Sequence, residues 1–198
     1  MPELLEALAH PAPQVAPVLL GARLSVGGVT LRLTEVEAYG GADDAGSHAF
    51  RRTPRSDIMF GPPGRLYCYL SYGIHVCANV VTGRDGEAGA VLLRAGEVTE
   101  GVEIVRTRRP GVADHRLASG PGVLCRALGI ELPANGTDLT RGPIRLELDP
   151  EPPTNSSAGP RVGLRQAATT PWRFWLPGEP TVTRYRAALA RGRGRDGA

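Results

Sequence analysis

The chain has 198 residues, which suffices for one domain with a substantial core and is short for two. Its 23 basic residues stand against 20 acidic ones, and the resulting net charge of +3 is compatible with an anionic partner without demonstrating one. The longest apolar runs are a few residues and no basic segment opens the sequence, which excludes a signal peptide and a membrane span and predicts a cytoplasmic protein.

Two short helices are expected at the beginning of the chain. Pro11 and Pro13 break the first of them, at residues 2–9, and the second ends near Gly21. The pattern then changes to strict alternation over residues 24–39, which predicts a hairpin that turns at two glycines and continues into a long strand.

Strand-like patterns dominate the rest of the sequence. Further strands are expected at residues 65–70, 74–81, 89–95, 144–148 and 173–178. Helical patterns interrupt them only at residues 99–108 and 121–130. Strands outnumber helices without a regular alternation, so the expected fold is a single α+β domain on a mostly antiparallel sheet, spanning residues 1–190. The proline-rich segment 148–160 is expected to be a surface loop, and the arginine- and glycine-rich tail 191–198 to be disordered.

The segment TEVEAYGGADDAGSH, residues 34–48, combines the end of the long strand with a cluster of acidic residues. On a strand of period two, Glu35, Glu37 and Tyr39 share one face. A solvated face would explain the two glutamates. However, the glycines after Tyr39 end the strand and bring His48 within reach, which assembles a base, an aromatic wall and a hydrogen-bonding imidazole. These groups suit a hydrolytic site that acts on a flat ring.

A second informative stretch is the predicted hairpin over residues 63–81. Tyr67 and Tyr69 share one strand face, Tyr72 falls at or near the tip, and Asn79 lies on the return strand. A tyrosine at an exposed tip either folds back on its own sheet or serves as a wedge between stacked bases.

The cysteines suggest no cross-link or metal site. Cys68, Cys77 and Cys125 are odd in number, widely spaced and without a zinc-type pattern, so they are expected to be reduced core residues.

The segment 34–48 and the predicted hairpin 63–81 together resemble the alkyladenine DNA glycosylase family, also called 3-methyladenine DNA glycosylases. The similarity runs in family order through LLGARL, TEVEAYGGADDAGSH, RTPRSDIMFGPPGRLYCYLSYGIHVCANVV, GAVLLRAGEVTEG, LASGPGVLCRALGI and RVGLRQAATTPWRFWLPGEPTV, between about Val15 and Val182. It implies a single α+β domain with a curved antiparallel sheet, flanking helices and a protruding β-hairpin that intercalates into DNA.

The resemblance also implies roles for seven residues. By position in the family motifs, Glu37 activates the attacking water and Arg94 lies beside that water. Three side chains line the pocket for the flipped base, Asn79 abuts the edge of the base, and Tyr72 fills the hole left in the duplex. The three pocket residues are Tyr39, His48 and Tyr69.

The chain departs from the vertebrate members at three places. The loop between His48 and Thr53 is shorter, the loop between Asn79 and Arg94 is longer, and His75 replaces an aromatic residue. These differences bear on contacts to the DNA backbone and on the lesion range, whereas the pocket residues match.

The expected function is excision of alkylated or deaminated purines from double-stranded DNA: 3-methyladenine, 7-methylguanine and hypoxanthine, with ethenoadenine as a further candidate. A damaged base must leave the stack before its sugar bond can be reached, and a carboxylate beside the sugar both stabilises positive charge and deprotonates water. Glu35 either raises the pKa of Glu37 or serves as a structural acceptor. Asp43 and Asp44 suit loop capping better than catalysis.

No cofactor or metal is expected, and the protein is expected to act as a monomer without membrane contact. Glycosylases that cut the strand use an amine, usually a lysine, and this sequence has none, which predicts monofunctional hydrolysis. GC-rich codon usage alone would explain the missing lysine, and an exposed Pro2 amine would be an alternative nucleophile.

Two other classes remain open at the level of sequence. A metal-dependent hydrolase or nuclease would use four side chains as ligands, and carboxylate sites usually draw them from several separated segments. These side chains are Glu35, Glu37, Asp44 and His48. A non-catalytic module that binds DNA lesions would need the tyrosines and arginines but not Glu37.

Overall fold

A computed structural model describes residues 2–188 of the chain. The tail predicted at residues 191–198 lies outside this range, as do the last two residues of the predicted domain. In the described part, the α-helices are α1 (Pro2–Leu8), α2 (Ala12–Val18), α3 (Val102–Arg108) and α4 (Pro121–Leu128). Short 3₁₀ helices are η1 (His48–Phe50), η2 (Asp57–Phe60), η3 (Asp114–Arg116) and η4 (Leu132–Ala134). No described helix is long and apolar enough to cross a membrane.

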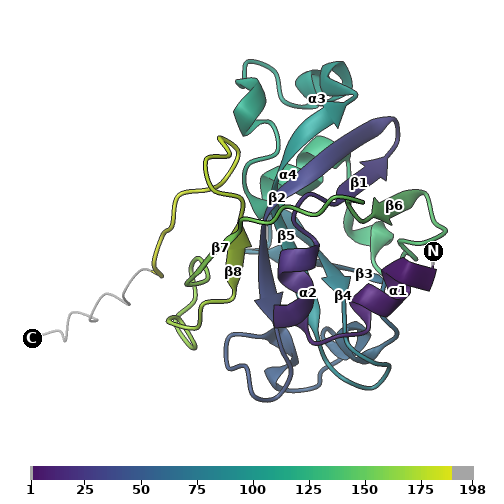
Figure 1. Cartoon of the computed structure of the whole chain (residues 1–198), viewed down its shortest axis with the longest axis vertical. Coiled ribbons are helices and arrows are strands. Elements are labelled where there is room, and N and C mark those ends of the chain that lie inside the picture. Colours follow the sequence, from purple (N-terminus) through teal and green to yellow (C-terminus); the bar gives the residue numbers. More distant parts are fainter. Residues whose placement is uncertain (1, 189–198) are drawn as a thin grey trace, which may run out of the picture.

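All the strands form one antiparallel sheet that curls around the core (Figure 1). The strands are β1 (Arg23–Val26), β2 (Val29–Tyr39), β3 (Leu66–Ser71), β4 (His75–Val81), β5 (Ala90–Glu100), β6 (Ile144–Glu147), β7 (Ser157–Gly159) and β8 (Arg173–Trp175). The order across the sheet is β3-β4-β5-β2-β1-β6, while β8 pairs with β2 and β7 with β8. The prediction of a single α+β domain with a curved, mostly antiparallel sheet is confirmed.

The long strand β2 lies at the centre of this arrangement. One of its edges pairs with β5, and its other edge pairs first with β1 and then, over Glu35–Glu37, with β8. The ladder with β5 is irregular on both sides of Glu35, and its register passes over Thr34 and Arg94. Such bulges twist a strand and re-aim its side chains, which here affects the residues of the acidic segment.

Both faces of β2 are buried, one in the hydrophobic core and the other, at Glu35 and Glu37, among polar partners. α2 packs against β2 and β5, and α4 packs against β4 and β5. Every residue from Thr34 to Ala38 is buried, and Glu35 and Glu37 are fully so. The interpretation of the two glutamates as a solvated face is therefore wrong. The three cysteines are free and buried, as predicted.

Two segments differ from the predicted elements. The proline-rich segment 148–160 is not only a loop, because it contains β7, a strand of three residues that pairs with β8. The helical pattern predicted from residue 99 begins later, since Thr99 and Glu100 still belong to β5 and α3 starts at Val102. Gly101 separates the two elements with a φ of 73°, and a Cβ there would lie 2.3 Å from the carbonyl oxygen of Gly28.

Candidate active site

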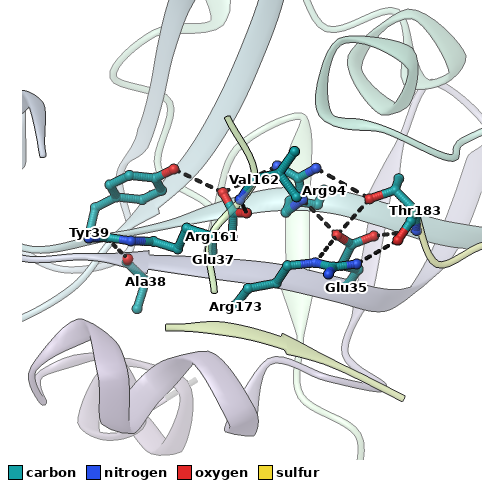
Figure 2. Close-up of polar contacts among 9 residues, drawn as sticks. All are labelled: Glu35, Glu37, Ala38, Tyr39, Arg94, Arg161, Val162, Arg173 and Thr183. Atoms are coloured by element: carbon teal, nitrogen blue, oxygen red, sulfur yellow. Dashed lines mark hydrogen bonds and ion pairs between the residues drawn. The ribbon is translucent and has the colours of Figure 1, made fainter. Parts of the chain in front are cut away.

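Glu37 lies on β2 and turns its carboxylate to the base of a cleft of about 520 Å³. The carboxylate is fully buried. It accepts hydrogen bonds from the Val162 amide at 2.7 Å and the Tyr39 hydroxyl at 2.9 Å, and it forms an ion pair with Arg94 Nη1 at 3.2 Å (Figure 2). A carboxylate offers about four acceptor positions, so the two hydrogen bonds leave acceptor capacity for a water molecule. The pKa of Tyr39 is well above its usual value, through burial first and the Glu37 charge second, which keeps its hydroxyl a donor.

Glu35 makes a different set of contacts two residues earlier. Its Oε1 lies 2.7 Å from Nε of both Arg94 and Arg173, and Thr183 donates its amide at 2.7 Å and its hydroxyl at 2.8 Å (Figure 2). Burial alone would raise the pKa of Glu35, but the Arg94 charge and the Thr183 amide lower it below its usual value. Glu35 does not line the cleft and is a structural acceptor, one of the two roles that the sequence left open.

Arg94 connects the two carboxylates from its place at the β5 bulge. It is 5% exposed, and one guanidinium pairs with both Glu35 and Glu37. Burial lowers the pKa of Arg94, but the two carboxylates, Glu37 first, raise it by more. Arg94 therefore stays protonated. The ion pairs account for a buried arginine at the base of the cleft.

The predicted pocket residues lie together at the inner end of the cleft. A cavity of about 80 Å³ is lined by Tyr39, His48, Tyr69 and Asn79, together with Gly46, Met59 and Leu164. The His48 ring stands edge-on to Tyr69 with centroids 4.6 Å apart, and its Nδ1 lies 3.0 Å from the Tyr67 hydroxyl. The structure thus brings into one place four side chains that the sequence spreads over about forty residues.

Asn79 contacts both the cavity and the backbone of the neighbouring strand. It lines the cavity, and its Nδ2 donates to the carbonyl oxygen of Tyr67, its register partner, at 3.0 Å. The bond holds the side chain in place against the cavity.

Tyr72 lies at the tip of the hairpin between β3 and β4, away from the sheet. Its φ is 51° and the residue is 91% exposed, with Ile74 beside it 73% exposed. The interpretation that the ring folds back on its own sheet is therefore wrong. A left-handed conformation costs a non-glycine residue about 1–3 kcal/mol, and such strain is common at functional sites.

Sequence reasoning missed the buried pair of Arg161 and Asp44. Arg161 is fully buried and makes a bidentate pair with Asp44 at 2.6 and 2.7 Å. Its guanidinium lies over the rings of Tyr39 and Trp172, at 4.7 and 5.2 Å from their centroids. Asp44 also accepts the amides of two loop glycines, so its predicted role in loop capping is confirmed. The RVG motif around Arg161 carries no periodicity that would have revealed the pair.

His48 is neutral at physiological pH. Desolvation, followed by the nearby charge of Arg55, lowers the pKa of His48 to about 4, although the residue as a whole is exposed at the cleft. Arg55 lines the same cleft, with its guanidinium 5.0 Å from the centroid of Tyr69.

We expect the His48 imidazole to titrate near pH 4 in an NMR titration, rather than near its ordinary value of 6.5. Substitution Arg55→Ala removes a positive charge that disfavours imidazolium and should raise this pKa. Arg52→Ala is the matched control, because Arg52 pairs with Asp57 and stacks on Phe60 instead. A midpoint that Arg55→Ala leaves unchanged would contradict this electrostatic coupling.

The ligands proposed for a metal-dependent hydrolase are not gathered into one set. Glu35 pairs with Arg94 and Arg173, and Asp44 pairs with Arg161. Across residues 2–188, no three His, Cys, Asp or Glu side chains lie close enough together to hold a metal ion.

Comparison with known proteins gives close relatives in three bacteria. The chain is 54% identical to a protein of Nocardia farcinica over 192 residues, covering 92% of this chain and 91% of the relative. It is 51% identical to proteins of Frankia casuarinae, covering 88% of each chain, and of Cutibacterium acnes, covering 89% and 96%. All three carry the provisional name 3-methyladenine DNA glycosylase. Together with the cleft that combines Glu37 with aromatic rings, these relatives define the class: a DNA-repair glycosylase, which is a hydrolase.

The family follows from a match over most of the chain. Residues 6–180 fit the family described as methylpurine-DNA glycosylase (MPG). The chain belongs to this family, which confirms the resemblance noted in its motifs.

Proposed function

We propose that the protein flips alkylated or deaminated purines out of duplex DNA and hydrolyses their N-glycosidic bond with a water activated by Glu37. The observation that carries the proposal is the Glu37 carboxylate at the base of the cleft. It is held by two hydrogen bonds and an ion pair with Arg94, and it keeps acceptor capacity for a water molecule. The substrates are 3-methyladenine, 7-methylguanine and hypoxanthine, with ethenoadenine as a further candidate.

In the proposed reaction, the water oxygen attacks C1′ of the deoxyribose and its proton passes to Glu37. The bond between C1′ and the base nitrogen breaks, and the base leaves with the electron pair, so an abasic site remains. The developing positive charge on the sugar is stabilised by the carboxylate, whose position is fixed by Arg94 and the Val162 amide. The neutral His48 and the tyrosine rings supply a stacking surface for the flipped base.

Incubation of the purified full chain with duplexes that each hold one modified purine, in EDTA, tests this function. Release of the free base with an uncut strand is the expected result. Binding without release would favour the non-catalytic module, and release that EDTA abolishes would favour the metal-dependent alternative. No protein–DNA adduct is expected on borohydride trapping, since the chain has no lysine to form a Schiff base. A trapped adduct would contradict the monofunctional reaction.

Tyr72 is proposed to occupy the space that the flipped nucleotide leaves in the duplex. Substitution Tyr72→Ser should weaken binding to a lesion or abasic duplex by roughly tenfold or more, because stacking on an aromatic ring contributes about 1–3 kcal/mol. Tyr72→Phe keeps the ring and should retain most of the affinity. Unchanged affinity of Tyr72→Ser for an abasic duplex would make Tyr72 a surface aromatic without this role.

Asn79 is proposed to exclude guanine, which differs from hypoxanthine by its 2-amino group. An amide held against the edge of the base rejects that group by clash or by leaving polar atoms unpaired. We expect Asn79→Ala and Asn79→Ser to raise the guanine-to-hypoxanthine ratio of single-turnover release rates by about 5- to 150-fold, the equivalent of about 1–3 kcal/mol. If both variants leave this ratio unchanged, Asn79 is structural and the discrimination lies elsewhere.

A further inference from the structure

A second hollow adjoins the cleft on the side of Tyr72. This groove of about 930 Å³ is bounded by Tyr72, by residues 162–166 and by residues 186–188. It shares Tyr72 and residues 162–164 with the cleft that Glu37 lines, so the two hollows are continuous along one wall.

The groove is basic. Arg165 and Arg186 line it and are exposed, and none of its lining residues is acidic. Neither guanidinium takes part in a salt bridge within residues 2–188, whereas the exposed Arg23, Arg52 and Arg106 are each paired with a carboxylate. The groove therefore presents two unneutralised cations of the kind that bind phosphate through a planar fork.

Both walls of the groove are connected to the buried carboxylates of β2, Glu37 and Glu35. Val162 donates its amide to Glu37, and the Gly163 amide donates to the Arg186 carbonyl at 3.0 Å. Thr183, three residues before Arg186, is bonded to Glu35. The wall at residues 186–188 lies beyond residues 6–180, over which the family model matches.

We propose that this groove binds the sugar–phosphate backbone of the strand that holds the flipped nucleotide, with Arg165 and Arg186 each contacting a phosphate. The inference rests on the proposed function. A flipped nucleotide remains covalently joined to both neighbours, so the strand must leave the cleft past Tyr72. The groove continues the cleft at that point, and phosphate is the group that two unpaired guanidinium forks recognise.

The test measures affinity for a duplex with a stable tetrahydrofuran abasic analogue over a range of KCl concentrations. Each lost phosphate contact reduces the slope of log K against log salt by about 0.9, so Arg165→Ala/Arg186→Ala should reduce it by about 1.8. Arg165→Lys/Arg186→Lys keeps both charges and should retain most of the slope. Arg141→Ala/Arg145→Ala is the control, because both arginines are exposed and Arg145 lies on β6, across the molecule from β7 and β8 (Figure 1).

A second measurement locates the contact on the strand. Neutral methylphosphonate linkages are placed one at a time beside the abasic analogue, and a linkage that weakens binding of the wild type should not weaken binding of Arg165→Ala/Arg186→Ala further. An unchanged slope, a loss no larger than in the control, or additive effects of linkage and variant would overturn the proposal. The abasic probe measures binding and needs no base release. A negative result for backbone binding in the groove is therefore distinguishable from a negative result for the proposed glycosylase reaction.

Discussion

Substitution Glu37→Gln is expected to lower the single-turnover rate of base release by about 10³-fold or more while the affinity for lesion duplexes changes little. General-base catalysis contributes about 10²–10⁴-fold, and the lost carboxylate charge adds to this loss. The amide also disturbs the local contacts. Val162 and Tyr39 donate to the two carboxylate oxygens and Arg94 is a cation, so the new NH₂ group must face at least one of these groups.

Two variants make this result specific. Glu97→Gln changes an exposed glutamate on β5, a strand that pairs with β2. It should leave the rate unchanged, since the ion pair of Glu97 within residues 2–188 is with Arg32, at the surface. Glu37→Asp keeps the charge on a side chain one methylene shorter and should fall between the wild type and Glu37→Gln. Near-normal single-turnover release by a folded Glu37→Gln would remove Glu37 from the mechanism.

Substitution Asp44→Ala is expected to destabilise the protein strongly. It leaves the Arg161 guanidinium buried without its carboxylate, and breaking a buried pair in this way costs about 3–5 kcal/mol. For a chain of this length, each kcal/mol lowers Tm by about 2–4 °C, so a loss of roughly 6–20 °C is expected in thermal unfolding. Adding Arg161→Met, which removes the unpaired buried charge, should restore part of the stability.

The control for this prediction is Asp57→Ala. Asp57 pairs with Arg52 at the surface, where both side chains are about 60% exposed, and such a pair contributes about 0–1 kcal/mol. Equal losses in the two variants would contradict the argument from burial.

The effect of Asp44 should also depend on pH in a defined direction. Burial opposes its ionisation, but the hydrogen bonds from Arg161 and the loop amides lower the pKa of Asp44 below its usual value. A carboxyl group with a lowered folded-state pKa contributes stability above its unfolded pKa of about 3.9 and loses it as the pH falls through the folded value. The difference between wild type and Asp44→Ala should thus be full at pH 7 and shrink below about pH 4.

The sequence predicted the parts of the site that depend on local pattern. Alternation along the long strand indicated that Glu37 and Tyr39 share a side, and the broken alternation after residue 70 indicated an exposed tip, where Tyr72 is found. These features depend on residues a few positions apart, which a period of two relates directly.

The ion pairs behind the cleft depend on contacts that no local pattern encodes. Arg161 lies 117 residues after Asp44, and Thr183 lies 148 residues after Glu35. The bulge that displaces Arg94 from the ladder arises where β2 and β5 meet and is a property of the pair of strands. β7 is too short to show periodicity, and it exists because β8 offers it an edge.

The bonds of Glu35 set an order of events during protein synthesis. Glu35 is made early, but it meets Arg173 and Thr183 only after 138 and 148 further residues have been added. At about 5–20 residues per second, a nascent chain carries this carboxylate without those partners for about 7 to 30 s. The strand that holds the acidic pair is therefore among the first parts translated and among the last to reach its final environment.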